Sequence, residues 1–268
     1  MKVKPAISFI SHGAPTMVLD ESRGQLYRSW AETIWPEKPE LILILSAHWQ
    51  TRNLALGTVE GGQLIYDFYG FPSQLYSMAY DAPGAPEARN SLHSFLAAAG
   101  LEISTVERGW DHGVWTPLRW LFPSANVPVL QLSLPNLDGA GLTDLGRLLG
   151  RWIHDRGAVW FIGSGGLTHN LGAIDFSESM PVPRQMQEFE STVLQFVERG
   201  QLAKLSNYRK EAPFAELNHP TEEHFLPLIP VMAAAMEIGH TTVAYPVSGF
   251  EFGTLSRRSI DFRPTPRT

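Results

Sequence analysis

Three short apolar runs, each leading to a histidine, constrain the fold of this chain more than any other feature of its sequence. The runs are Ala6–Ile10, Leu41–Trp49 and Val159–Ile162. The second opens with five aliphatic residues, too few for an independent helix, so we expect strands buried on both faces, as in a parallel sheet. The first two runs place His12 and His48 just past the ends of their strands, and the third leads through glycines to His169. Because ligands bind at the carboxyl ends of strands in open α/β sheets, we expect these histidines at one site.

The rest of the chain alternates between strand and helix patterns. Further strands are expected at Leu101–Val106, Val127–Leu132 and Thr242–Tyr245. Amphipathic helices are expected at Glu87–Ala99, Leu142–His154 and Arg184–Arg199. Residues 53–80 have an irregular or hairpin-like pattern with a turn at Gly61-Gly62. This alternation predicts the α/β class: a single domain over residues 1–268 with a three-layer α/β/α architecture, in which the middle layer is a mixed, largely parallel sheet. Residues 263–268 are expected to be frayed.

Charge and composition exclude several classes of partner. The 268 residues carry a formal net charge of −6, which argues against a nucleic acid partner. The chain has no cysteine, so disulfides and thiolate metal sites are excluded, and a transition metal would need His, Asp or Glu ligands. No stretch approaches the roughly 18 apolar residues of a membrane span, and the first residues lack the apolar region of a signal peptide. We therefore expect a cytoplasmic protein with no membrane partner, and the sequence leaves its oligomeric state open.

His12 and His48 are the first candidate metal ligands. Each follows a buried strand and has small neighbours, Ser11 and Gly13 for the first and Ala47 for the second, that leave room for a ligand. Two imidazoles that meet at one sheet edge fit a metal site. The alternative is a pair of turn histidines that are hydrogen-bonded to backbone groups.

His169 lies in a glycine-rich segment. Gly163, Gly165 and Gly166 would let the backbone approach a ligand closely. A phosphate-binding loop is the alternative, but neither the G-x-x-x-x-G-K-[ST] nor the G-x-G-x-x-G pattern is present. The segment is not a G-x-S-x-G elbow, and no Ser-His-Asp set accompanies it, which disfavours a serine hydrolase.

His112 stands between two tryptophans, Trp110 and Trp115. Such aromatic neighbours suit a site that stacks on a flat substrate, and Trp115 is a candidate substrate-binding residue. The alternative is a structural histidine between two core tryptophans.

The segment 218–224 gathers side chains that can bind a metal: His219, Glu222, Glu223 and His224. A helix start with Thr221 as N-cap would explain the two glutamates, which are favourable in a first turn and would then point to solvent. It does not explain His224, whereas a neutral, metal-bound imidazole avoids the unfavourable helix dipole. His219 precedes a proline, so we expect it to orient the turn or to lie near a substrate.

Five motifs carry a family resemblance. They are SHGAPT at 11–16, SAHW at 46–49, DHGVWTPL at 111–118, GSGGLTHN at 163–170 and HPTEEHFLPL at 219–228. In this order and spacing they resemble the class III extradiol ring-cleaving dioxygenases, and within them the DOPA 4,5-dioxygenase branch of bacteria and betalain-making plants. The similarity covers nearly the whole chain.

This resemblance implies a mononuclear non-haem iron(II) site at one edge of an α/β sheet. By motif position, His12 and His48 would be metal ligands and His224 would fall at the third ligand position. His169 would be the acid/base residue and His112 would face the substrate. The implied reaction opens the ring of a DOPA-like catechol beside its two hydroxyls, with O2 as co-substrate, and gives a muconic semialdehyde. The aromatic segment Tyr66–Phe71 is a candidate wall of the pocket.

One position departs from the wider family, which uses two histidines and one glutamate as metal ligands. Here His224 occupies the third position, and the DOPA branch shares that histidine. Three neutral imidazoles suit zinc as well as iron. Purified protein could therefore carry Zn(II), with His169 as a possible fourth ligand, and such a form would be inactive as a dioxygenase.

Two other functions remain open from the sequence. A zinc hydrolase could use the same histidines to activate water, with Glu222 or Glu223 as the base, although there is no HExxH motif. A non-catalytic binding protein of the same fold is the second alternative, and the intact set of histidines argues against it.

Overall fold

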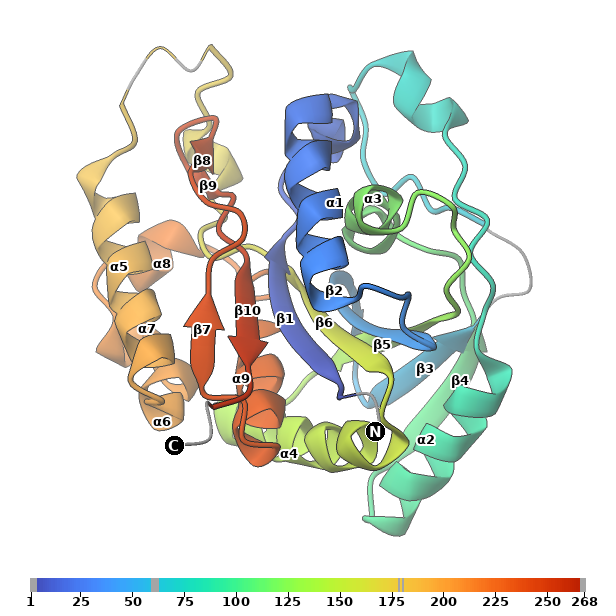
Figure 1. Ribbon diagram of the computed structural model, residues 1–268. Helices are drawn as coiled ribbons and strands as arrows, with labels where there is room; N and C mark the ends of the chain where they lie inside the picture. Colours follow the sequence, from blue (N-terminus) through green and yellow to red (C-terminus); the bar gives the residue numbers. More distant parts are fainter. Residues whose placement is uncertain (1–3, 59–62, 178, 180, 266–268) are drawn as a thin grey trace.

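The apolar runs of the sequence form one mixed sheet (Figure 1). The fold is described from a computed structural model, which covers residues 4–58, 63–177, 179 and 181–265. In this part of the chain the sheet has eight strands in the order β4-β3-β5-β2-β6-β1-β10-β7. Their bounds are β1 Ala6–Ser11, β2 Leu41–Thr51, β3 Leu54–Thr58, β4 Ile103–Glu107, β5 Val129–Pro135, β6 Val159–Gly165, β7 Thr242–Ala244 and β10 Ile260–Arg263. A separate hairpin is formed by β8 Phe250–Glu251 and β9 Leu255–Ser256.

The centre of the sheet is parallel, as predicted. Strands β5, β2, β6 and β1 pair in parallel, with Ile42 of β2 opposite both Val129 and Trp160. The remaining contacts include antiparallel pairs, β3 with β5 and β10 with β1. The carboxyl ends of the four central strands therefore lie at one edge, where the candidate site was expected.

Helices cover both faces of the sheet (Figure 1). Alternate residues of β1 separate the two sides: Ile7 and Phe9 belong to one apolar cluster, whereas Ala6 and Ile10 belong to the other. The first cluster packs against α2 Pro86–Ala98, α4 Gly139–Arg156, α5 Arg184–Glu198 and α9 Leu228–Glu237, and the second against α1 Glu21–Ile34 and α3 His112–Leu121. The predicted α/β/α layering is confirmed.

Short helical segments complete the connections. They are η1 Pro15–Leu19, η2 Ser73–Ser77, η3 Leu171–Ala173, α6 Leu202–Ser206, α7 Tyr208–Glu211 and α8 Ala215–Asn218. Of the helices in the described ranges, none combines the length and the apolarity that a membrane span requires.

Strand β2 is longer than predicted, and His48 lies inside it rather than past its end. Its pairing with β6 stops at Ser46, but its pairing with β5 resumes at Gln50 after a shift in register. Between Leu45 and Gln50, four residues of β2 face the single residue Ser133 of β5. A bulge of this kind bends a strand and redirects its side chains. It places His48 at the edge of the parallel sheet.

The region 53–80 also differs from the prediction. Strand β3 forms no hairpin with the segment that follows, because it lies between β4 and β5. Leu64 forms only an isolated bridge with Trp110. The expected turn at Gly61-Gly62 lies outside the described residues.

The end of the chain is tied to the body of the protein further than expected. Arg263 belongs to β10, and the Thr265 N–H donates to the Gly239 carbonyl at 3.2 Å. The prediction of a frayed end is therefore wrong for residues 263–265, and 266–268 lie outside the described part of the chain.

Two glycines of the segment 163–166 lie within β6 and approach the protein's own backbone, not a ligand. A Cβ on Gly165 would stand 2.0 Å from the His224 carbonyl oxygen, and one on Gly163 would stand 2.7 Å from the Pro227 carbonyl oxygen. The adjacent Gly166 N–H donates to the same His224 carbonyl at 2.9 Å. The missing side chains thus let the segment that carries His224 lie directly against β6.

We expect Gly165→Ala to lower the free energy of unfolding by about 1–3 kcal/mol, since the new methyl group must push the His224 backbone away. Gly166→Ala is the matched control, because the nearest neighbour of its Cβ would be the Thr168 carbonyl oxygen, at 3.3 Å. Denaturant unfolding of the two metal-free variants compares them. Equal stability would contradict the proposed close contact.

Candidate metal centre

The structure brings the predicted histidines together from five separate segments. His12 follows β1, and its backbone N–H donates to the Gly165 carbonyl at 3.0 Å. His48 comes from the bulge of β2, and His112 is the first residue of α3. The remaining two lie in the loop after β6 and in the turns before α9: His169 and His224.

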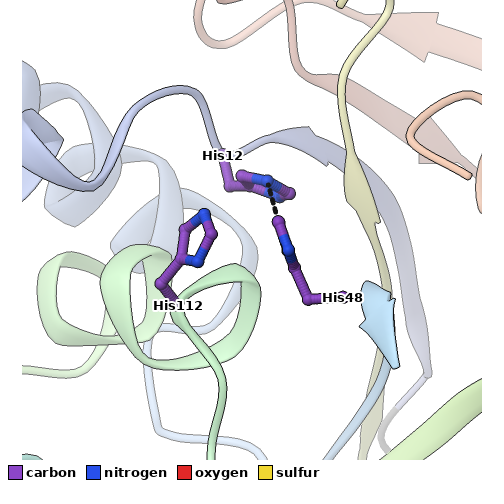
Figure 2. Close-up of side chains that lie close together, drawn as sticks. All are labelled: His12, His48 and His112. Carbon is purple, nitrogen blue, oxygen red and sulfur yellow. Dashed lines mark hydrogen bonds between the residues drawn. The ribbon is translucent and has the colours of Figure 1, made fainter. Parts of the chain in front are cut away.

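Ring nitrogens converge at the centre of this group. Figure 2 shows His12, His48 and His112 arranged around one space, with the first two rings in contact. The Nε2 atoms of His12 and His48 are 3.0 Å apart, and those of His48 and His224 are 3.3 Å apart. Two nitrogens that each bind one ion at about 2.1 Å stand about 3.0 Å apart at a right angle and about 3.4 Å apart at the tetrahedral angle. The observed separations therefore fit ligands of a single transition-metal ion.

The neighbours of His12 determine which of its nitrogens carries the proton. Ser164 Oγ donates to the Gly113 carbonyl, so it can only accept from His12 Nδ1, which lies 2.9 Å away. The Gly113 carbonyl is open to Ser164 because residue 117, four positions along α3, is Pro117 and has no N–H to offer. His12 consequently turns an unprotonated Nε2 toward the centre.

One carboxylate, that of Asp67, serves two histidines. Its Oδ1 accepts from His112 Nδ1 at 2.8 Å and from the His112 backbone N–H at 3.1 Å. Its Oδ2 lies 3.2 Å from His48 Nδ1. Burial raises the pKa of Asp67, but the hydrogen bonds from His112 outweigh it and hold that pKa below its ordinary value. The ionised carboxylate favours a proton on Nδ1 of both rings.

His224 has its own carboxylate. Glu223 Oε1 accepts from His224 Nδ1 at 3.0 Å, which leaves His224 Nε2 free to bind a metal. Burial raises the pKa of Glu223, but several hydrogen bonds and charges oppose it, the hydrogen bond from His224 first among them. Together they lower this pKa to about 2.

The prediction of a helix start at this segment is wrong. Residues 221–227 form bends and turns, and α9 begins only at Leu228. The backbone of this segment lies directly against β6, at His224 and Pro227. Glu222 does face solvent, with 46% of its side chain exposed, and it also accepts from Tyr208 and Arg209. Glu223 instead accepts from His224 and orients that ring.

Burial keeps the imidazoles neutral, which is the form that binds metals. It lowers the pKa of both His12 and His48 well below the ordinary value, and the neighbouring histidines lower each further. It also lowers the pKa of His224, although Glu223 opposes the shift. Burial and then His224 lower the pKa of His169 to about 2.

Two groups in the described part of the chain have potential metal-binding atoms within 4.8 Å of one another. One is His12, His48 and His112, and the other is His169, Glu223 and His224. They adjoin through the contact between His48 and His224. The His169 and His224 rings stack at 3.5 Å with an angle of 8° between their planes. His169 thus borders the centre, as a fourth ligand or a proton-transfer group must.

Two predicted substrate-binding residues are buried elsewhere. Trp115 is fully buried in the core beneath the aromatic segment, 6.3 Å from the Phe68 ring, so the alternative of core tryptophans holds for it. His219 is also fully buried, and its Nε2 donates to the Leu167 carbonyl at 2.8 Å. Aromatic rings surround it: Phe189, Tyr208 and Phe225. Of its two expected roles, the contact with Leu167 supports the orientation of the turn, and burial disfavours contact with a substrate.

Sequence reasoning missed the three acceptors, Asp67, Ser164 and Glu223, as partners of the histidines. Glu223 was considered only as a possible ligand or helix-start residue, and Asp67 was visible only as a carboxylate within the aromatic segment Tyr66–Phe71. In that segment Phe68 meets the His112 ring edge-on at 5.6 Å, whereas Tyr69 is 91% exposed and contributes no wall.

Comparisons with known proteins identify the family of this chain. The family model of the catalytic LigB subunit of aromatic ring-opening dioxygenase matches residues 4–252. The chain is 37% identical over 263 residues to the 4,5-DOPA dioxygenase extradiol of Beta vulgaris, with 96% of each chain covered. It is 34% identical over 262 residues to the Escherichia coli K12 protein of the same name, with 96% of this chain and 93% of that one covered.

A solved structure has the same fold. The crystal structure of an uncharacterised protein of Escherichia coli K12 matches with a TM-score of 0.77 and 26% identity, covering 96% of this chain and 99% of that one. Together with the sequence matches, this shows that the chain belongs to the LigB family of aromatic ring-opening dioxygenases, in the branch of the 4,5-DOPA dioxygenase extradiol proteins.

Proposed function

We propose that this ring-opening dioxygenase acts on a DOPA-like catechol and gives a muconic semialdehyde, with Fe(II) held by His12, His48 and His224. The observation that carries the proposal is the convergence of three Nε2 atoms: that of His48 lies 3.0 Å from that of His12 and 3.3 Å from that of His224. The printed names of the relatives support a DOPA-like substrate. When bound, Fe(II) would supply the redox chemistry that brings O2 to react with an electron-rich ring.

His169 is the group that we assign to proton transfer. Its imidazole is neutral in the free protein and lies against His224, at the border of the metal centre. A neutral imidazole can accept the proton of a catechol hydroxyl and return it later in the reaction. His112 presents its own Nε2 to the same space, because its Nδ1 proton is engaged by Asp67, and we assign it to accept a hydrogen bond from the substrate.

The placement of the glutamates weighs against a zinc hydrolase. That reaction would need Glu222 or Glu223 as the base that activates water. The first is paired with Arg209 at 3.0 Å and the second is engaged by His224. Neither carboxylate is free for that role. Zinc remains a plausible ion for the purified protein, since three neutral imidazoles bind it well.

Oxygen uptake tests the proposed function. Protein loaded with Fe(II) under anaerobic conditions is mixed with L-DOPA or catechol in an oxygen electrode, and uptake is expected together with the colour of a semialdehyde. Zinc-loaded protein is the control and should consume no oxygen, because Zn(II) has no redox chemistry. An iron-loaded protein that consumes no oxygen with either catechol would contradict the proposal.

We expect His12→Ala, His48→Ala and His224→Ala each to abolish stoichiometric metal binding, because each removes one of three ligands on a rigid, buried scaffold. His112→Ala should retain the metal and lose substrate affinity. Elemental analysis of the metal-loaded variants distinguishes the two sets. Metal loss in the His112 variant with retention in the His224 variant would exchange their roles.

The two adjacent glutamates should differ in their effect on metal affinity. Glu223→Gln is expected to weaken metal binding by about 10–100-fold, since the amide no longer supplies a charged acceptor to His224 Nδ1. Glu222→Gln, whose side chain contacts Tyr208 and Arg209, should stay within a few-fold of the unaltered protein. Zinc titration against a chelator measures both. The same affinity in the two variants would remove Glu223 from the site.

His169→Gln should keep the metal and lower turnover by roughly 10²–10⁴-fold, the usual contribution of a positioned acid/base group. Steady-state oxygen uptake and metal analysis on the same sample give the two values. If the metal is lost together with activity, His169 is a ligand instead. A turnover equal to that of the unaltered protein would move the base elsewhere, with His112 as the next candidate.

A further inference from the structure

Asp67 occupies an unusual position, because its two carboxylate oxygens face two different imidazoles. Oδ1 lies 2.8 Å from His112 Nδ1, and Oδ2 lies 3.2 Å from His48 Nδ1. The two rings are themselves adjacent, with centroids 3.9 Å apart and an angle of 48° between their planes. One side chain thus contacts a proposed metal ligand and the histidine assigned to the substrate.

The backbone holds this carboxylate in place. The His112 N–H donates to Asp67 Oδ1 at 3.1 Å, at the first turn of the ten-residue helix α3, where a negative charge is favourable. The residue at the N-cap position, Asp111, makes no capping bond, because its carboxylate accepts from Ser46 and Gln131 instead. Asp67 therefore supplies the capping acceptor from a segment 45 residues away in sequence.

We propose that Asp67 is a positioning residue that fixes the same tautomer, with the proton on Nδ1, in the metal ligand His48 and in the substrate-facing His112 at once. A carboxylate can do this because both of its oxygens only accept. The Nε2 atoms of both rings are then unprotonated and available, one for the ion and one for a substrate hydroxyl. The inference rests on the proposed function, since it takes the metal and substrate roles from there.

The neighbouring carboxylate provides the contrast. Glu223 contacts one imidazole of the centre, that of His224, through a single oxygen at 3.0 Å. Loss of Glu223 should therefore disturb metal binding alone. Loss of Asp67 should disturb metal binding and, independently of any ion, the tautomer of a histidine that binds none. The two variants thus separate a shared carboxylate from an ordinary partner of one ligand.

The experiment uses Asp67→Ala, with Glu223→Gln as the matched control and zinc as a diamagnetic ion. Zinc affinity is measured against a chelator, and imidazole ¹⁵N spectra of histidine-labelled, zinc-loaded protein give the tautomer of His112. We expect Asp67→Ala to weaken zinc binding by about 10–100-fold and to move the His112 proton from Nδ1 to Nε2. Glu223→Gln should weaken zinc binding to a similar degree and leave the proton of His112 on Nδ1.

Each outcome bears on the inference. Unaltered zinc affinity in Asp67→Ala, or a His112 that keeps its proton on Nδ1 there, would overturn it. If that variant does not fold, the unaltered protein still decides, because a His112 protonated on Nε2 in its spectrum contradicts a shared role for Asp67. If the unaltered protein binds zinc and one of these contrary results is found, the inference is rejected and the proposed metal site stands. An unaltered protein that binds no zinc would reject the proposed metal site and the inference with it.

Discussion

The site depends on one recurring interaction, in which an imidazole donates a hydrogen bond from Nδ1–H to an acceptor behind it and turns its Nε2 lone pair inward. Ser164, Asp67 and Glu223, from three different segments of the chain, accept these hydrogen bonds. Unprotonated nitrogens 3.0–3.3 Å apart repel one another unless a cation lies between them. The acceptors, as well as the histidines, therefore make this group a candidate metal site.

Local departures from regular structure place the histidines and their acceptors. A bulge in β2 turns His48 toward the edge of the sheet. A proline inside α3 frees the Gly113 carbonyl to accept a hydrogen bond from the Ser164 hydroxyl. The Ser164 oxygen can then only accept from His12. Glycines in β6 allow the turns that carry His224 to press against the strand. Each irregularity disturbs one strand or helix locally and positions one candidate ligand histidine.

Hydrophobic patterning predicted the central strands and the meeting of the histidines, because both follow from local sequence and from the geometry of parallel sheets. It could not predict the shift in register at His48, which depends on where β5 resumes pairing. Their neighbours in the sequence made Trp115 and His219 candidates for substrate contact, and both side chains are buried. No local pattern distinguishes an aromatic or imidazole ring in the core from one in a pocket. The Asp67 contact was missed because its partner, His112, lies 45 residues away in the sequence.

The departure from two histidines and one glutamate also has an electrostatic side. A divalent ion held by three neutral imidazoles keeps its full charge in a buried place, which is unfavourable without compensation. Asp67 and Glu223 both have lowered pKa values despite burial, which by itself raises them, and are therefore ionised. In the proposed site, their two negative charges would balance the charge of the ion through the imidazoles that they contact. Carboxylate charge in the proposed site would thus lie in the hydrogen bonds behind the ligands and not among the ligands themselves.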